Sequence, residues 1–506
     1  MRKKKEKGRK FGPVFVLMFL TLFIIFMSIV LSMVGFEGNQ AAINNNTIET
    51  NLVTVRNVFS LEGIHFLIGN VKNNLSSFSP LVVLIISLIG IGIGEKSGLL
   101  EALFSKFKNW KSNHITMLTL FIGIISSFLG EDVYAFLIPL VGVFYKYAGR
   151  NSRLGILTMF LGIGAGYGTS LLGGYLDYLL GGATQLAARV EVDKTYQFQV
   201  FSNLYIMLGS TLILTFVGTV IIERLLAPKY PKKTPLLEEP LPTSRKGLLA
   251  TTIISLIFLL IISYGLFPKL PYGGFLLDLS QKNYYAQAFG TNAPFGQSFV
   301  FLIVLLLMIN SFVYGFISKN IKSTNDYSIG LSKSFEGTGY VFVLMFFSAQ
   351  MIAILNWTNL GTVLSARLVS LLSSIQFSGI ALITTFFLIV ILMSIIIPGT
   401  EEKWTLLHPI IVPLFMRSNM TPDFTQFIFR AADGIGKCMT PMYAYFIVLL
   451  AFLQKYNYDE SYEITIFGTL KKLLPCVLLF AGLWILILVG WFVIGLPMGV
   501  GVYSAL

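Results

Sequence analysis

Two adjacent carboxylates and a lysine interrupt a part of the chain that is otherwise apolar. Glu401, Glu402 and Lys403 follow the apolar run 380–397 and precede a second apolar run, 409–416. Charged side chains are costly in hydrocarbon and usually face a substrate, an ion or a water-filled cavity. These residues would therefore be suited to binding a charged substrate or a coupling ion. An ordinary aqueous loop between two membrane spans is the alternative.

A similar pattern occurs in the first half of the chain. Glu131 and Asp132 follow a glycine and precede an apolar segment, 133–145, that is too short to cross about 30 Å of hydrocarbon. Broken apolar segments at corresponding positions of two halves are typical of inverted-repeat transporters. A helix that ends inside the bilayer must turn its unpaired backbone groups toward a ligand, an ion or water. We therefore expect two re-entrant hairpins, although one acid of each pair could serve only as a helix cap.

Two further acids lie within apolar sequence. Asp177 sits in a glycine-rich segment, and Asp433 has Arg430 three residues before it and Lys437 four residues after it. These spacings place the three side chains on one helix face. Asp177 would carry ion coupling or form a structural pair with a nearby Arg or Lys. Asp433 would take part in ion or proton coupling while its basic neighbours hold an anionic substrate, or the three would form a self-neutralising structural cluster.

The sequence contains no motif for a resident metal or for catalysis. Its two cysteines and three histidines are scattered, and no His-rich, Ser-Lys or paired-Asp catalytic pattern is present. We therefore expect no cofactor and no enzyme. Thr440 and Pro441 could break a helix and free carbonyl groups for Na⁺, or could produce only a kink. A passive channel remains the alternative to an ion-coupled carrier.

The composition predicts the elements that must position these residues. The 506-residue chain is 55% hydrophobic and 12% charged, with a mean hydropathy of +0.76. Such values indicate an all-α polytopic membrane protein, with about nine transmembrane helices and the two hairpins. The predicted spans are 14–34, 80–94, 115–128, 203–220, 248–266, 298–316, 340–355, 380–397 and 474–494.

Charge and proline divide the chain into four parts. Residues 1–13 form a basic cytoplasmic tail, 14–226 a first half with hairpin one, 227–247 a charged, proline-rich cytoplasmic linker, and 248–506 a second half with hairpin two. The net charge of +13 lies largely in short loops, as the positive-inside rule expects, and does not indicate nucleic-acid binding. We expect an uncleaved first helix with a cytoplasmic N-terminus, followed by a polar external loop at 35–79.

Several stretches resemble one known family. They are GIGIGEKSGLLEALF, INSFVYGFISKNIKS, FFSAQMIAILNWTNLG and FRAADGIGKCMTPMYAYFIVLLAFLQKY. The chain is similar to the p-aminobenzoyl-glutamate transporter (AbgT) family of bacterial inner-membrane proteins over nearly its whole length. The resemblance implies a homodimer of nine-helix protomers in the lipid bilayer. It also implies transport of p-aminobenzoyl-glutamate, related folate breakdown products or sulfonamide-type antimetabolites, coupled to a Na⁺ or H⁺ gradient.

The resemblance also implies site residues. By motif, the substrate-binding positions are Glu401, Lys403, Trp404, Pro422, Arg430 and Pro441, and the coupling or ion positions are Asp177, Asp433, Ser394 and Thr440. Lys403 and Arg430 would compensate substrate carboxylates, and Trp404 would pack against an aromatic ring. The chain departs from the family in PGTEEKW, where an expected serine is Glu401 and an expected small residue is Glu402. Two extra negative charges disfavour a dianionic substrate, so a different carboxylate or a peptide-like substrate is the alternative.

Overall fold

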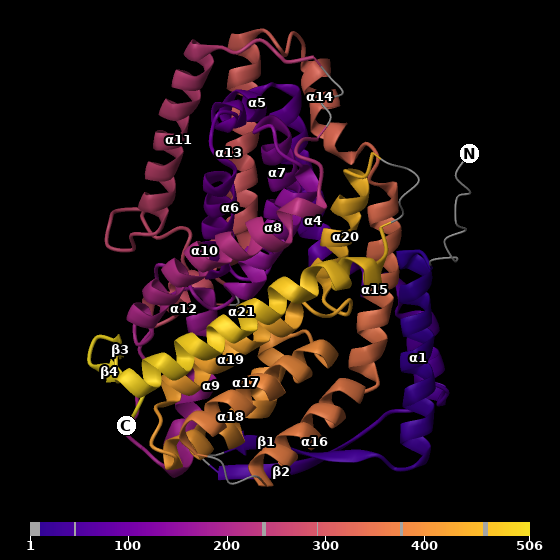
Figure 1. Cartoon of the computed structure of the whole chain (residues 1–506), viewed down its shortest axis with the longest axis vertical. Helices are drawn as coiled ribbons and strands as arrows, with labels where there is room; N and C mark the ends of the chain where they lie inside the picture. The colour runs from indigo at the N-terminus through magenta and orange to yellow at the C-terminus, as the bar shows by residue number, and fades with distance from the viewer. Residues whose placement is uncertain (1–10, 45–46, 235–238, 291, 375–377, 459–463) are drawn as a thin grey trace.

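The computed structural model describes residues 11–44, 47–234, 239–290, 292–374, 378–458 and 464–506. Most of the predicted basic tail and part of the predicted linker lie outside these residues. The described chain is predominantly helical, with two short antiparallel sheets (Figure 1).

Nine helices in the described part of the chain are long and apolar enough to cross a membrane. Each coincides with one of the nine spans predicted from the sequence, which confirms that part of the expectation. They are α1 (Pro13–Met33), α4 (Ser79–Lys96), α6 (Ser112–Ser126), α10 (Leu204–Leu225), α11 (Arg245–Gly265), α13 (Pro294–Ser318), α15 (Gly339–Trp357), α17 (Gly379–Ile396) and α21 (Ile466–Ile494).

The shorter helices fill the space between these spans. The longer members of this group are α7 (Val133–Tyr147), α8 (Ser152–Ala165), α9 (Tyr175–Glu191), α16 (Leu360–Ser374), α18 (Thr400–Arg417), α19 (Pro422–Lys437) and α20 (Ala444–Lys455). The shortest are α2 (Leu61–Gly69), α3 (Val71–Ser76), α5 (Leu99–Phe104), α12 (Tyr284–Phe289) and α14 (Thr324–Ser332).

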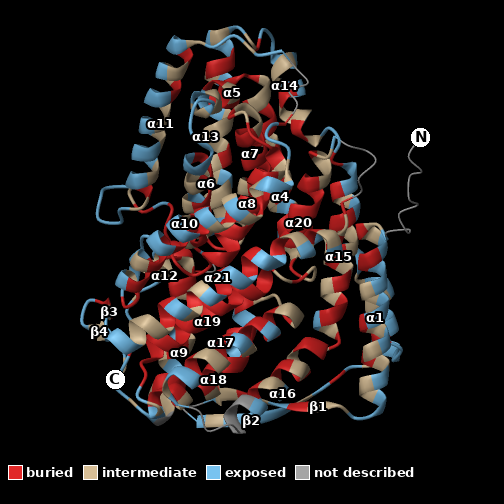
Figure 2. Cartoon of the chain, viewed as in Figure 1, coloured by how far each residue is buried: buried red, intermediate tan, exposed pale blue. Residues whose placement is uncertain are grey.

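The most deeply buried helices are short ones, and the spans pack around them. Every residue of α19 is buried, and so is all of α8 except Arg153, whereas α1 and α11 each expose many apolar side chains (Figure 2). α8 packs on α6 and α7, and α19 packs on α17 and α18. A helix that is apolar on its outer face suits contact with lipid. The two halves of the sequence therefore contribute to one core, surrounded by membrane-spanning helices.

The predicted external loop at 35–79 contains regular structure. Strands β1 (Glu37–Asn44) and β2 (Thr47–Thr54) pair antiparallel, with Glu37 opposite Thr54, and α2 and α3 follow. β1 packs on α16 and α18, which explains why this polar segment is ordered. A second small sheet joins β3 (Pro497–Gly499) to β4 (Val502–Tyr503) near the C-terminus.

The aqueous-loop interpretation of Glu401–Lys403 is wrong. α17 ends at Ile396 and α18 begins at Thr400, so only three residues separate the helices. Glu401, Glu402 and Lys403 occupy the first turn of α18, where acids favour the positive end of the helix dipole. The apolar run 409–416 is also not a separate piece, because α18 continues through two internal prolines to Arg417. The re-entrant geometry stays a prediction.

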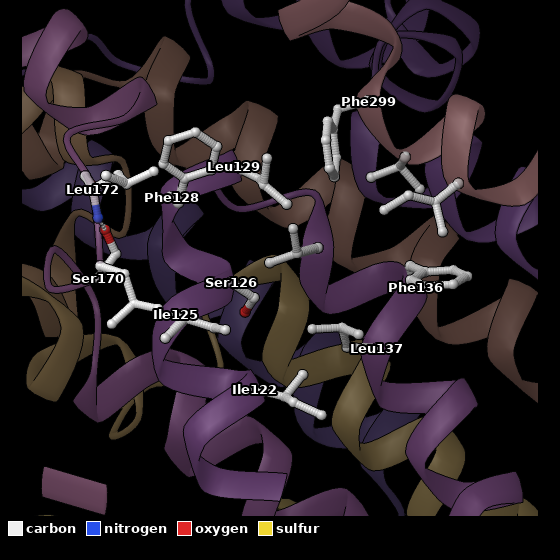
Figure 3. A pocket seen from close by; sticks show the side chains of 14 residues that line it. Ile122, Ile125, Ser126, Phe128, Leu129, Phe136, Leu137, Ser170, Leu172 and Phe299 are labelled. Carbon is white, nitrogen blue, oxygen red and sulfur yellow. Dashed lines mark hydrogen bonds between the residues drawn. The ribbon is translucent and has the colours of Figure 1, made fainter. Parts of the chain in front are cut away.

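An apolar cavity of about 370 Å³ lies between α6, α7 and α13 (Figure 3). Ile122, Ile125, Leu129 and Phe299 are among the side chains that point into it. Its lining carries no charged residue, so this cavity does not provide the charged chemistry expected from the sequence.

Candidate functional site

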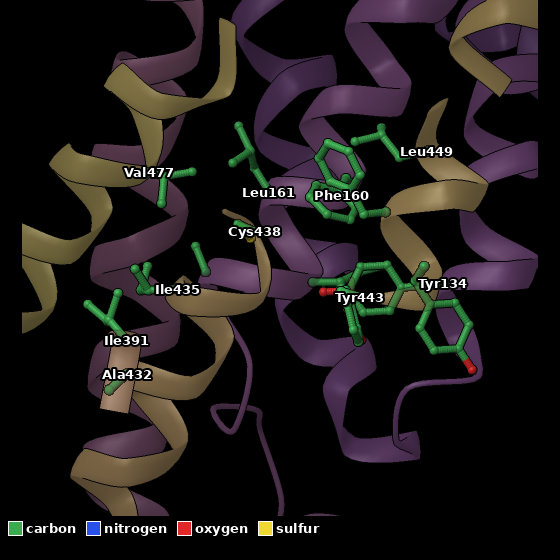
Figure 4. Packing of buried hydrophobic residues seen from close by; sticks show 14 of the residues in the cluster. Tyr134, Phe160, Leu161, Ile391, Ala432, Ile435, Cys438, Tyr443, Leu449 and Val477 are labelled. Atoms are coloured by element: carbon green, nitrogen blue, oxygen red, sulfur yellow. The ribbon is translucent and has the colours of Figure 1, made fainter. Parts of the chain in front are cut away.

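Close packing fixes α19 in the middle of the molecule. A methyl group added at Gly434 would lie 2.2 Å from the carbonyl oxygen of Gly164, so α8 and α19 approach too closely for any side chain there. Around this contact, Tyr134 packs against Phe160 and Tyr443, with ring centroids 5.6 Å apart in each pair (Figure 4). Closely packed apolar side chains and backbone therefore fix the position of α19 and of its polar side chains.

A buried carboxylate between two lysines forms the centre of the site. Asp433 Oδ1 lies 2.5 Å from Lys403 Nζ, and Asp433 Oδ2 lies 3.0 Å from Lys437 Nζ. Ser394 Oγ and Thr400 Oγ1 donate hydrogen bonds of 2.8 and 2.7 Å to the same carboxylate. All five side chains are buried. Ion pairs and hydrogen bonds together offset the cost of burying these charges.

Glu131 completes the network from the first half of the chain. Lys437 Nζ forms an ion pair with Glu131 Oε1 and also donates to Thr400 Oγ1. The Tyr167 hydroxyl donates to the same Glu131 oxygen at 2.9 Å and lies 3.0 Å from Thr400 Oγ1. Lys403 Nζ additionally donates to the carbonyl oxygen of Ile397 at 2.7 Å. We call Glu131, Tyr167, Ser394, Thr400, Lys403, Asp433 and Lys437 the lysine network.

Within the lysine network, two ammonium groups balance two carboxylates. The acidic segment before α7 and the start of α18, which the sequence analysis matched as corresponding positions, meet at Glu131 and Thr400. The sequence singled out Glu131 and Lys437, but it held no signal for Thr400 or Tyr167. Their roles depend on contacts between residues 233 apart in the chain.

The second intramembrane acid pairs with an arginine from α19. Arg430 Nη1 lies 2.5 Å from Asp177 Oδ1, and Arg430 Nη2 donates to the carbonyl oxygen of Gly168 at 2.5 Å. Asp177 also accepts from the backbone N–H of Gly174 at 3.0 Å, which caps α9. Gly168 has φ +84°, and a Cβ there would lie 2.5 Å from Arg430 Cβ. The ion-pair partner of Arg430 is therefore Asp177. Arg430 is not part of an intrahelical cluster with Asp433.

Trp404 is buried in the interior of the protein and does not line the apolar cavity between α6, α7 and α13. Its indole Nε1 donates to Thr184 Oγ1 at 3.2 Å, and its ring packs on Phe429 at 4.7 Å. In this arrangement protein atoms from α9 and α19 cover the ring. Pro422 and Pro441 lie at opposite ends of α19, at its first position and just beyond its end.

The Thr440–Pro441 segment is a helix break and not a kink. α19 ends at Lys437, and α20 begins only at Ala444. Thr440 Oγ1 donates to the carbonyl oxygen of Ile395 at 2.8 Å and accepts from the N–H of Met442 at 3.2 Å. The threonine hydroxyl thereby satisfies one backbone N–H within the break and connects the break to the end of α17.

A cavity of about 480 Å³ opens onto the lysine network. Its charged lining residues are four carboxylates, Glu131, Asp132, Glu401 and Glu402, and no lysine or arginine lines it. Its uncharged polar lining residues are four tyrosines, Tyr167, Tyr175, Tyr178 and Tyr445, together with Gln297 and Thr400. The acidic residues of PGTEEKW therefore face this cavity, which we call the acidic vestibule, while Lys403 of the same helical turn points into the protein.

The comparisons with known proteins agree with this architecture. The model of the AbgT transporter family matches residues 7–506. The p-aminobenzoyl-glutamate transport protein of Escherichia coli (strain K12) is 30% identical over 499 residues, covering 97% of this chain and 94% of that protein.

Two solved structures share the fold. The YdaH transporter of Alcanivorax borkumensis matches with a TM-score of 0.50 at 24% identity, covering 96% of this chain and 100% of that chain. Neisseria gonorrhoeae MtrF, described as illuminating a class of antimetabolite efflux pumps, matches with a TM-score of 0.50 at 25% identity and 98% coverage of both chains. The match over nearly the whole chain and the 30% identity to a curated relative lead to one conclusion: this chain is a membrane transporter that belongs to the AbgT family.

Proposed function

We propose that this protein is a secondary active transporter of p-aminobenzoyl-glutamate or a closely related folate-derived aromatic compound, driven by a proton or sodium gradient. The observation that supports it most directly is the lysine network, whose buried ammonium groups and carboxylates meet an open cavity at Glu131 and Thr400. The name of the E. coli relative supports the substrate, and the description of MtrF supports testing sulfonamide-type antimetabolites as well.

Ion-pair exchange would couple substrate to ion. A substrate carboxylate can reach Lys403, Lys437 or Arg430 only by replacing the protein carboxylate that holds that cation. A displaced Asp433 or Asp177 would then be a buried anion without a partner, which is strongly unfavourable until a cation neutralises it. Substrate binding and cation binding would therefore stabilise the same state, which is the thermodynamic basis of coupling.

The acidic vestibule favours a second candidate, a carrier of a neutral or cationic aromatic compound. Four carboxylates and four tyrosines line it without any lysine or arginine. Such a surface attracts cations to aromatic faces and repels a dianion before it reaches the lysines.

Radiolabelled flux into proteoliposomes distinguishes these candidates. We expect gradient-dependent flux of p-aminobenzoyl-glutamate in the wild type and its loss in Asp177→Asn, while the control Asp278→Asn, at a half-buried position that lines neither cavity, transports normally. Flux that follows only the substrate's own electrochemical gradient would indicate a passive channel. Flux that appears only in Glu401→Ser would show that the vestibule acids select a different substrate.

The proposed setting is a homodimer in the bacterial inner membrane, with a cytoplasmic N-terminus. The basic residues at the start of the chain support this orientation through the positive-inside rule. A cysteine placed at the N-terminus should react with a membrane-impermeant maleimide only after the membrane is opened. The mass in detergent by light scattering tests the dimer.

A further inference from the structure

Three acidic side chains are fully buried in the described part of the chain, and one of them has no cation. Asp433 pairs with two lysines and Asp177 with Arg430. Asp423, in the first turn of α19, is 4% exposed and forms no ion pair with any described residue. Its Oδ2 accepts a hydrogen bond of 2.8 Å from the Tyr196 hydroxyl, but Oδ1 has no hydrogen-bond partner.

Three further buried polar side chains in this part of the molecule lack hydrogen-bond partners. Ser202, just before α10, lies near enough to Asp423 to stabilise its charged form, but its hydroxyl is not within hydrogen-bond geometry of any described residue. Neither the side-chain oxygen nor the nitrogen of Asn203 and Gln426 has a partner, and both residues are 0% exposed. Buried amide groups are almost always hydrogen-bonded, so two unpaired amides and an unpaired carboxylate oxygen at the start of α10 and α19 call for an explanation.

Two contacts relate the four side chains. Gln426 lies one turn after Asp423 and one turn before Arg430, so all three share a face of α19. Met207 Sδ on α10 lies 3.9 Å from Arg430 Nη2, and Ser202 lies near Asp423. These two contacts place the start of α10 near this face of α19. From their positions between the two contacts, we infer that Asn203 and Gln426 lie near Asp423.

We propose that Asp423, Ser202, Asn203 and Gln426 form a site for a monovalent metal cation such as Na⁺. Hard cations bind oxygen ligands, and these residues offer four side-chain oxygens that no described residue occupies. Each amide can turn its oxygen toward the ion, because no hydrogen bond fixes the orientation of either amide group. One carboxylate balances one positive charge, whereas a divalent ion would leave a buried charge uncompensated. Water would satisfy the amides, but Asp423 would then have to take up a proton to become neutral.

The site differs in character from the lysine network. There, the oxygens of Asp433, Thr400 and Glu131 already face the ammonium groups of Lys403 and Lys437, which occupy the position that a free cation would need. If the proposed transport function holds, the Asp423 site supplies the coupling ion two turns from Arg430 on the same helix. Cation binding itself does not depend on that function.

Thermal unfolding of the purified full-length protein tests the proposal. We expect the melting temperature to rise saturably with NaCl and not with choline chloride at equal ionic strength. Asp423→Asn should abolish this rise. Ser202→Ala and Gln426→Leu should raise the half-saturating Na⁺ concentration about tenfold or more, since loss of one ligating or supporting group commonly weakens metal binding by that factor.

A matched serine variant separates this site from the lysine network. Ser394→Ala removes a buried hydroxyl beside Asp433 and should leave the Na⁺ response unchanged. Direct binding of radioactive ²²Na⁺ to wild type and Gln426→Leu decides the question if Asp423→Asn does not fold. An equal response to choline, a response that survives in Asp423→Asn, or one abolished by Ser394→Ala overturns the proposal. Na⁺ binding without any substrate flux would count against the transport proposal alone.

Discussion

Lys437 on α19 and Glu131 before α7 form an ion pair in the interior of the protein, although 306 residues separate them in the chain. The same ammonium group lies 3.0 Å from Asp433 and 4.2 Å from the centre of the Tyr167 ring. Lys437 of α19 thus contacts the segment before α7 and the segment after α8 at the end of the acidic vestibule. A movement that separates the segment before α7 from α19 must break the Lys437–Glu131 ion pair.

Removal of Lys437 should be costly for stability. Lys437→Met leaves Glu131 with no cation and Asp433 with one instead of two, and breaking a buried pair typically costs about 3–5 kcal/mol. We expect a clearly lower melting temperature in detergent and loss of transport. The double variant Lys437→Met with Glu131→Gln should recover part of the stability, because it removes the orphaned charge. Lys269→Met, at an exposed position, serves as the control and should melt like the wild type. A single variant as stable as the wild type would contradict the network.

Arg430→Lys should impair transport even though it keeps the charge. The guanidinium contacts both Asp177 and the Gly168 carbonyl, and an ammonium group cannot reproduce this planar geometry. We expect transport to fall to about a tenth or less, with a raised KM in the flux assay. Arg150→Lys disturbs another internal pair, with Glu223 at 3.0 Å, and should lower stability without changing KM. A KM change of equal size in both variants would argue against a role of Arg430 at the substrate.

Gly168→Ala should disturb the Asp177–Arg430 pair through the backbone. Gly168 has φ +84°, and the added methyl group would lie 2.5 Å from Arg430 Cβ. Strain of this kind costs about 1–3 kcal/mol, so the melting temperature and transport should both fall. Gly182→Ala is the matched control in α9, where a methyl group meets nothing within 4 Å, and it should be neutral or slightly stabilising. Equal behaviour of the two variants would exclude the steric explanation.

Replacing both Glu401 and Glu402 by serine should strengthen binding of anionic substrates. Both carboxylates are exposed in the acidic vestibule and repel a dianion on its way to the lysines. We expect a KM for p-aminobenzoyl-glutamate several-fold lower at low salt, with the difference shrinking as ionic strength rises. Glu62→Gln on α2, also exposed, controls for the general loss of negative charge. An unchanged KM would show that the vestibule acids do not influence anion entry.

The sequence alone determined the membrane-spanning elements. Hydropathy, segment length and charge are local properties, and a spanning helix must satisfy its own backbone hydrogen bonds, so all nine spans could be located without tertiary information. The same local reasoning singled out the unusual acids at Glu131, Asp177, Glu401 and Asp433, but it left a helix break and a kink at Thr440–Pro441 as alternatives.

The tertiary structure decided which charges meet. Asp177 pairs with Arg430, which is 253 positions away, and Lys437 pairs with Glu131, which is 306 positions away. No periodicity within either segment specifies these partners. Glu401 and Lys403 are separated by one residue, but helix geometry turns the first into the vestibule and the second into the core. Asp423 drew no attention as a first-turn acid of a helix. Its lack of a cation became visible only when packing had buried it against Tyr196, because burial is a property of the assembled fold and not of the local sequence.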